Sequence, residues 1–247
     1  MCGRYAITMP PSAMRDLFGF AGQPNFPARY NIAPTQPVPI IRREGGARHF
    51  VLVRWGLIPA WSKEAPQSLL INARAETISE KPSFRGAFRH RRCLMPADGF
   101  YEWKTVGKGA KQPYFIRRRD GRPMAFAAIW ENWMTKDGSE IETCAIVTTQ
   151  ANATLAPIHT RMPVILDEKD FDRWLDPATP EKELFALMRP AADDLLVADP
   201  VSTAVNRVAN DDATLTIAID EHTAAALTTP GPKRKPKPTD ERQADLF

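Results

Sequence analysis

The stretch from Val38 to Val147 is rich in strand signals, which occur as short runs of apolar residues. Turn-forming pairs, Gly45-Gly46, Asp120-Gly121 and Asp137-Gly138, separate several of these runs. Runs of this length bounded by turn residues are typical of strands in an antiparallel sheet. The pattern predicts strands at residues 37–42, 48–55, 92–95, 99–104, 113–118, 124–131 and 142–148.

Helical signals flank this strand-rich stretch. Residues 10–20 begin with two prolines and contain a late glycine, as a short helix often does. Residues 150–158, 167–175 and 179–189 are also predicted to be helices. We therefore expect an α+β fold in a single domain over residues 2–227, with an antiparallel, barrel-like sheet and peripheral helices.

Composition narrows the class of protein. The chain has 247 residues, of which 43% are hydrophobic, enough for a substantial core. It lacks a signal peptide and any apolar run approaching about 18 residues, so we expect a cytoplasmic protein without membrane contact. Three cysteines without a CxxC motif and four scattered histidines favour neither a disulfide framework nor a metal site, and we expect no cofactor. The net charge of +4 is compatible with nucleic-acid binding.

The chain begins Met1-Cys2-Gly3-Arg4-Tyr5. Initiator methionine is normally removed before a small residue, and this would leave Cys2 with a free α-amine beside its thiol. These groups have pKa values of about 8 and about 8.5, so both are usable nucleophiles near neutral pH. Such an aminothiol condenses with an aldehyde to an imine and then closes a thiazolidine ring. The alternative is that Cys2 is an ordinary packing residue.

Polar residues also gather where apolar runs end. Asn72 follows Leu69-Leu70-Ile71, Glu102 lies between aromatic residues, and His159 precedes a second apolar run. Each residue also has a structural interpretation: Asn72 as a turn or cap residue, Glu102 as a solvent-facing strand residue, and His159 as a buried structural histidine.

Taken together, these segments resemble the SRAP family, the SOS-response-associated peptidases, over about residues 2–225. Six separated blocks in the same order carry the resemblance: Cys2-Gly3-Arg4-Tyr5, Asn31-Ile32-Ala33-Pro34, Trp55-Gly56-Leu57-Ile58-Pro59-Ala60-Trp61, Asn72-Ala73-Arg74-Ala75-Glu76, the run from Cys93 to Trp103, and His159-Thr160-Arg161-Met162-Pro163.

The resemblance implies a covalent reaction with DNA. Family members recognise abasic sites in single-stranded DNA and crosslink to them through the N-terminal cysteine, which shields the lesion. By this analogy Cys2 supplies the attacking amine and the thiol that closes a thiazolidine. Glu102 and His159 form the acid/base pair, one acting on the α-amine and the other on the sugar oxygen, and Asn72 orients the amine.

DNA contacts are the second expectation. Arg4, Arg74 and Arg161 each adjoin or lie close to a chemical residue and are predicted to hold phosphates. The basic run 85–92 and its aromatic residue suggest a groove for single strands, although a solvated charged face is the alternative. In this groove Arg85 is a candidate phosphate contact, and Trp61 and Phe88 are candidate stacking residues. The alternative for Trp61 is a place in the core.

Two other functions remain open. Cysteine, histidine and glutamate could serve a cysteine peptidase or N-terminal-nucleophile hydrolase that removes its own Met1. A non-covalent single-strand-binding module is the other. We expect a monomer close to replicating DNA.

The composition changes near Thr228, and the Lys/Pro-rich tail 228–247 is predicted to be disordered. Its last residues, Gln243-Ala244-Asp245-Leu246-Phe247, resemble the short bacterial motif that binds the sliding clamp, in which a glutamine and a terminal Leu-Phe pair fill a pocket. A tail without a partner is the alternative.

Overall fold

A computed structural model describes residues 2–64, 66, 68–107 and 109–228. Five strands close into a barrel by pairing in the ring β10–β4–β3–β6–β9–β10, in which β10–β4 is the parallel pair and the others are antiparallel. The barrel strands are β3 (Pro37–Glu44), β4 (Ala47–Trp55), β6 (Arg92–Ala97), β9 (Met124–Met134) and β10 (Glu140–Gln150). The expected α+β fold with a barrel-like sheet is confirmed.

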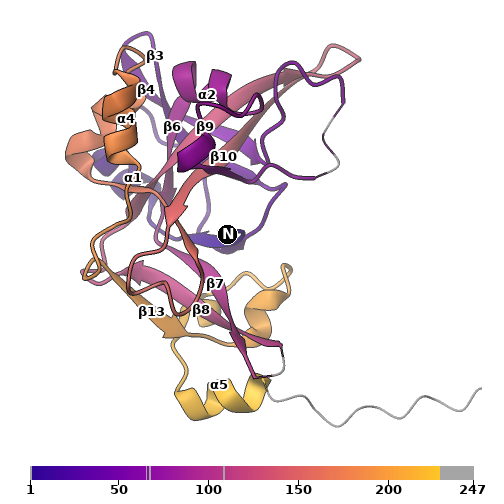
Figure 1. Ribbon diagram of the computed structural model, residues 1–247, viewed down its shortest axis with the longest axis vertical. Helices are drawn as coiled ribbons and strands as arrows, with labels where there is room; N and C mark the ends of the chain where they lie inside the picture. Colours follow the sequence, from indigo (N-terminus) through magenta and orange to yellow (C-terminus); the bar gives the residue numbers. More distant parts are fainter. Residues whose placement is uncertain (1, 65, 67, 108, 229–247) are drawn as a thin grey trace, which may run out of the picture.

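A second, five-stranded sheet lies below the barrel in Figure 1, and the chain begins between the two. Its strands are antiparallel and follow the order β13-β8-β7-β1-β2. They comprise β13 (Leu196–Pro200), β8 (Ala110–Arg118), β7 (Gly99–Val106), β1 (Tyr5–Ile7) and β2 (Arg29–Ile32). The predicted strands at 99–104 and 113–118 belong here, and the other five predicted strands form the barrel.

Three short strands extend the barrel at one end. β5 (Asn72–Arg74) pairs in parallel with β10 at residues 146–148, and β11 (Arg161–Pro163) pairs antiparallel with β10 at residues 148–150. β12 (Ile165–Leu166) pairs with β9. The end of β10 is therefore flanked by the two segments that carry the polar blocks around Asn72 and Arg161.

The helices are short and peripheral: α1 (Pro11–Phe18), α2 (Arg85–His90), α3 (Phe171–Leu175), α4 (Glu181–Leu187) and α5 (Glu221–Thr228), with 3-10 turns η1 (Ala75–Thr77), η2 (Glu168–Asp170), η3 (Thr203–Asn206) and η4 (Ala213–Thr216). The predictions at 10–20, 167–175 and 179–189 correspond to α1, η2 with α3, and α4. No helix in the described part of the chain is long and apolar enough to cross a membrane.

The helix predicted at 150–158 is wrong. Residues 153–158 form turns that end in His159. The Asn152 side chain accepts the Leu155 N–H at 3.1 Å and donates to the carbonyls of Ala191 and Ala192, while Asp193 accepts the Ala153 N–H. These tertiary hydrogen bonds satisfy the backbone and side chains without a regular helix.

Alternation along β1 and β7 decides which side chains face the barrel. Tyr5 and Phe100 belong to the main core, whereas Ala6 and Tyr101 pack in a separate cluster on the other face of the small sheet. Gly99 has no side chain because a Cβ there would overlap the ring of Phe115. Since successive strand residues alternate, Glu102 faces the barrel with Phe100.

Candidate functional site

Cys2 lies beside β7, between the barrel and the small sheet. Tyr5 pairs with Phe100, and the Tyr101 N–H donates to the Arg4 carbonyl at 2.9 Å. Continuing this register toward the N-terminus brings Gly3 beside Glu102. Cys2 is fully buried, and its Sγ lies 3.9 Å from the Arg4 carbonyl.

Asn72 holds the main chain of Cys2 from the barrel side. Its Nδ2 donates to the Cys2 carbonyl at 2.9 Å. Its Oδ1 is buried and has no hydrogen-bond partner among the described residues. An unpaired buried acceptor is costly unless a donor arrives. Because β5 pairs with β10, the amide is fixed by the sheet, with one oxygen open to a donor.

Glu102 supplies a buried carboxylate next to Cys2. Its side chain is 3% exposed, which corrects the alternative of a solvent-facing residue. Burial and then the Glu102 carboxylate raise the pKa of the Cys2 thiol well above its ordinary value. The structure thus brings together an aminothiol residue, an amide and a carboxylate. Such a set can orient an amine and accept its proton.

His159 lies in the turn that precedes β11. Its Nδ1 lies 3.0 Å from the backbone N of Arg161 and 3.3 Å from the Arg161 carbonyl oxygen, and the backbone N–H of His159 donates to the Leu155 carbonyl at 2.9 Å. The ring is half-buried at the end of β10. Its participation in an acid/base pair stays a prediction.

Two of the predicted phosphate-binding arginines are already engaged within the protein. Arg161 forms a bidentate pair with Glu76 at 2.7 and 2.9 Å and donates to the Thr148 carbonyl at 2.6 Å. These hydrogen bonds hold the pKa of Glu76 below its usual range. Arg4 Nη1 donates to Asn31 Oδ1 at 2.7 Å and to the Val205 carbonyl at 2.8 Å. In this conformation both guanidinium groups tie segments of the fold together.

The surface contacts predicted around 85–92 separate into two groups. Phe88 is fully buried in the core, 5.8 Å from the ring of Phe185 and 6.3 Å from that of Trp174, so its prediction as a base-stacking residue is wrong. The run forms helix α2, which buries this residue on its inner side. Arg85 and Arg74 are exposed, and Trp61 is 67% exposed. These three remain candidates for DNA contact.

Sequence reasoning missed the residues that fasten the start of the chain. Asn31 is fully buried, and its Nδ2 donates to the carbonyls of Val205, Arg207 and Asn210. Nothing in residue spacing relates position 31 to positions 205–210. The sequence did mark Asn31 as part of the block Asn31–Pro34, but that block did not indicate which residues Asn31 binds.

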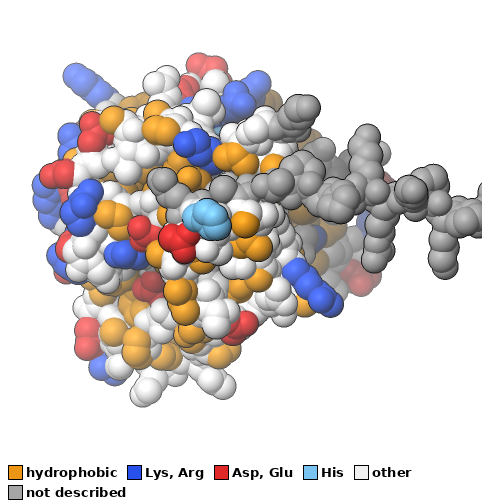
Figure 2. All heavy atoms as spheres, turned by 90° about the horizontal axis from the view of Figure 1, so that it is seen from below, with side chains coloured by type: hydrophobic (Ala, Val, Ile, Leu, Met, Phe, Trp, Pro, Cys, Tyr) orange, Lys and Arg blue, Asp and Glu red, His pale blue; other side chains and the backbone are white. Residues whose placement is uncertain are grey.

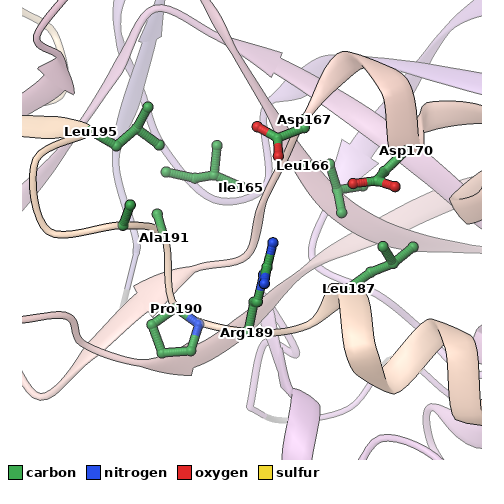
Figure 3. A pocket seen from close by; sticks show the side chains of 10 residues that line it. Ile165, Leu166, Asp167, Asp170, Leu187, Arg189, Pro190, Ala191 and Leu195 are labelled. Atoms are coloured by element: carbon green, nitrogen blue, oxygen red, sulfur yellow. The ribbon is translucent and has the colours of Figure 1, made fainter.

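Other surfaces of the described residues include a cavity and a face with mixed charges. A cavity of about 320 Å³ lies between β12 and the end of α4, and the Arg189 side chain points into it toward Asp167 (Figure 3). It contains none of the predicted catalytic residues. The face in Figure 2 has scattered Lys and Arg side chains among acidic and apolar ones. Among the described residues, no group of His, Cys, Asp and Glu could hold a metal ion.

Comparisons with known proteins agree with this arrangement. Residues 1–208 match the family described as SOS response associated peptidase (SRAP). The chain is 38% identical over 216 residues to Abasic site processing protein YoqW of Bacillus subtilis, covering 85% of this chain and 96% of that protein. It is 34% identical over 226 residues to Abasic site processing protein YedK of Escherichia coli, covering 87% and 98%.

A relative from Gallus gallus, Abasic site processing protein HMCES, is 34% identical over 257 residues, covering 85% of this chain and 76% of that protein. Among solved structures, a protein from Bacteroides thetaiotaomicron superposes with a TM-score of 0.81 at 28% identity, covering 88% of this chain and all of that one. A Bordetella bronchiseptica protein superposes with a TM-score of 0.72 at 27% identity, covering 81% and 100%.

Proposed function

The chain belongs to the SRAP family, and from this premise we propose that it processes abasic sites in single-stranded DNA by forming a covalent crosslink through Cys2. The observation that carries the proposal is the environment of Cys2: Asn72 Nδ2 donates to its carbonyl at 2.9 Å, and the buried Glu102 carboxylate helps to raise the pKa of its thiol. The names of the similar bacterial and vertebrate proteins supply the substrate class.

Loss of Met1 exposes the α-amine of Cys2. The ring-opened abasic sugar presents an aldehyde at C1′, which the amine attacks to give a carbinolamine and, after loss of water, an imine. The thiol then adds to the imine carbon, the imine nitrogen takes up a proton, and a five-membered thiazolidine closes. The net change joins amine, thiol and aldehyde with release of one water, and no oxidant or cofactor is needed.

The side chains around Cys2 suit this order of events. The raised pKa keeps the thiol protonated at neutral pH, so the amine is the better first nucleophile. Asn72 Oδ1 is available to accept from the amine. Glu102 takes the proton that the amine releases, and His159 protonates the sugar oxygen as the furanose ring opens. Proton transfers of this kind contribute about 10²–10⁴-fold to a rate.

Single-stranded DNA would be held by the exposed candidates. Arg74 follows Asn72 by two residues on β5, so a phosphate bound there would lie close to the reacting sugar. Arg85 and Trp61 extend the contact surface; the Trp61 Nε1–H reaches the Pro82 carbonyl at 3.4 Å and thereby connects its loop to the segment before α2. An aromatic ring beside basic residues is a sequence-tolerant way to hold a single strand.

The decisive assay is a denaturing gel after incubation with a single strand containing one abasic site. The wild-type protein should give a shifted band, and Cys2→Ser should not, because it keeps the amine but cannot form a stable thiazolidine. Intact mass establishes whether Met1 has been lost. An unshifted band from wild-type protein without Met1 would overturn the proposal.

A peptidase function is the second candidate, favoured by the family's description. Here Cys2 would attack a peptide carbonyl with Glu102 or His159 as base. Cleavage of a peptide substrate by the wild type, lost in Cys2→Ala, together with no gel shift on abasic DNA, would favour this candidate. The same intact-mass measurement on a Glu102→Gln variant reports whether removal of Met1 depends on the protein itself.

The tail suggests a partner. Residues Gln243, Asp245, Leu246 and Phe247 lie outside the described residues, so support for a sliding-clamp motif comes from sequence alone. Binding to a clamp would raise the concentration of the protein near replicating DNA. Nucleoid association and a monomeric state belong to the same proposal.

A further inference from the structure

The N-terminal segment is fastened by a part of the chain about 200 residues away. The 202–212 segment, which contains η3, runs past β2 and the start of β1. Asp211 accepts the backbone N–H groups of Tyr30 and Asn31, and Arg29 pairs with the same carboxylate at 2.5 Å. Val205 packs in the cluster on the outer face of the small sheet. This segment is therefore bound to the sheet by both polar and apolar contacts.

Two side chains of this sheet reach the 202–212 segment from positions next to the candidate site. Arg4, two residues from Cys2, donates to both Asn31 and the Val205 carbonyl. Trp103, adjacent to Glu102, donates from Nε1 to Asn206 Oδ1 at 2.7 Å. The guanidinium carbon of Arg4 lies 5.8 Å from the centre of the Trp103 ring. Arg4 and Trp103 are thus held to each other and to the same distant segment.

The position of Cys2 depends on these contacts. The Arg4 carbonyl receives the Tyr101 N–H and lies near the Cys2 thiol. If Arg4 or Trp103 shifted, the continuation of the β1–β7 register that brings Cys2 toward Glu102 would loosen. Strand β1 has three residues, Tyr5–Ile7, so it has little pairing of its own to resist fraying.

We propose that Asn31 and Asn206 are positioning residues: they hold Arg4 and Trp103 so that the N-terminal segment keeps Cys2 beside Asn72 and Glu102. The expected consequence, slower crosslinking, rests on the proposed function. Its structural part, local protection of Cys2, is independent of DNA. Asn206 is the residue to test because its side chain lies on the surface.

The test uses the full-length protein with Asn206→Ala, Asn206→Asp and a matched control, Asn132→Ala. Asn132 also makes one side-chain hydrogen bond, to Glu140 at 2.9 Å, but on barrel strand β9. Iodoacetamide alkylation is followed for each cysteine by peptide mass. Cys93 and Cys144, both fully buried in the core, report global unfolding, and Cys2 reports local loosening.

Asn206→Ala should speed alkylation of Cys2 by about three- to ten-fold, as expected for the loss of one hydrogen bond, without changing Cys93 or Cys144. Asn206→Asp keeps the acceptor oxygen and should restore protection, and Asn132→Ala should match the wild type. Crosslinking by Asn206→Ala at saturating abasic DNA should slow by a similar factor with unchanged DNA affinity.

Two results would overturn the proposal: Cys2 alkylation in Asn206→Ala equal to wild type, or a parallel rise at all three cysteines. If the wild type forms no crosslink at all, the proposed function fails, while the alkylation pattern still decides whether Asn206 positions Cys2. A slower crosslinking rate without local loosening of Cys2 would also contradict the positioning role.

Discussion

At the scale of single residues, Glu102 concentrates the most chemistry. It lies in the barrel-facing phase of β7, is 3% exposed, and acts electrostatically on the Cys2 thiol. From the sequence alone, alternation along the strand did not decide whether the Glu102 side chain faces solvent or the core. In the structure, Phe100 packs in the main core and Tyr101 in the second cluster. Because side chains alternate, Glu102 lies on the same face of the strand as Phe100.

Glu102→Gln should slow crosslinking by about 10²–10⁴-fold, because the amide keeps the shape of the side chain but cannot accept a proton. Affinity for a single strand should stay unchanged, since the side chain is buried and presents little surface to DNA. Single-turnover gels at saturating abasic DNA measure the rate, and fluorescence anisotropy with an unreactive strand measures affinity. A wild-type crosslinking rate in this variant would remove Glu102 from the acid/base pair.

At the scale of elements, a side chain between two strands fixes the end of β1. Asp98 joins β6 to β7, and its Oδ2 accepts the N–H groups of Thr8 and Met9 and the Thr8 hydroxyl. These donors have left the strand ladder and would otherwise need another partner. The carboxylate therefore ends β1 and ties the N-terminal segment to the chain reversal between the two sheets.

Replacing this group, Asp98→Ala, should lower the free energy of unfolding by about 1–3 kcal/mol, because partly buried donors lose a charged acceptor. Urea denaturation followed by tryptophan fluorescence measures the change. Asp16→Ala is the matched control, because Asp16 is an exposed partner of Arg15 and should contribute little. Equal stabilities of the two variants would show that Asp98 is not a structural anchor.

The sequence predicted the long elements better than the short ones. All seven predicted strands are present, and each belongs to an element of six or more residues, long enough for its apolar run to be read from the sequence. Strands β1, β5, β11 and β12 have three residues or fewer and carry no readable period. The wrong helix at 150–158 and the unpredicted helix α2 reflect tertiary contacts, made by Asn152 and Phe88, that local preference does not contain.

The candidate site divides in a similar way. Cys2 and Asn72 could be found from the sequence, since chain position and a matching block mark them, and the structure joins them by a hydrogen bond. The engagement of Arg4 with Asn31 and of Arg161 with Glu76 could not, because both partners are distant in sequence. Adjacency to a chemical residue indicates nearness to the site, but it does not indicate which group a guanidinium binds.

At the scale of the whole molecule, buried thiols make stability depend on alkaline pH. Burial raises the pKa of Cys2, Cys93 and Cys144 above the ordinary value, so the folded protein retains protons that the unfolded chain releases above about pH 8.5. The stabilisation is complete below that pH and is lost as pH rises. Each thiol should reduce the free energy of unfolding by about 1.4 kcal/mol per pH unit in this range.

Urea denaturation at pH 7.5, 8.5 and 9.5 tests this expectation. The free energy of unfolding should fall by about 1 kcal/mol between the first two values and by about 3 kcal/mol more by the third. Cys144→Ala should lower stability overall and make the fall shallower, because one of the titrating thiols is gone. A curve that stays flat to pH 9.5 would mean that the thiols ionise as readily in the folded protein as in the unfolded chain.

The two ends of the chain have different proposed roles: Cys2 reacts with DNA, and residues 243–247 bind a sliding clamp. Deleting residues 243–247 should abolish binding to a bacterial sliding clamp in calorimetry, because Leu246 and Phe247 supply the apolar anchors of the motif. Crosslinking to abasic DNA in the absence of clamp should be unchanged, since the reacting groups lie in the barrel domain. Alanine at Thr239 and Asp240, upstream of the motif, is the control and should bind as the wild type does. Full clamp affinity after the deletion would leave the tail without this role.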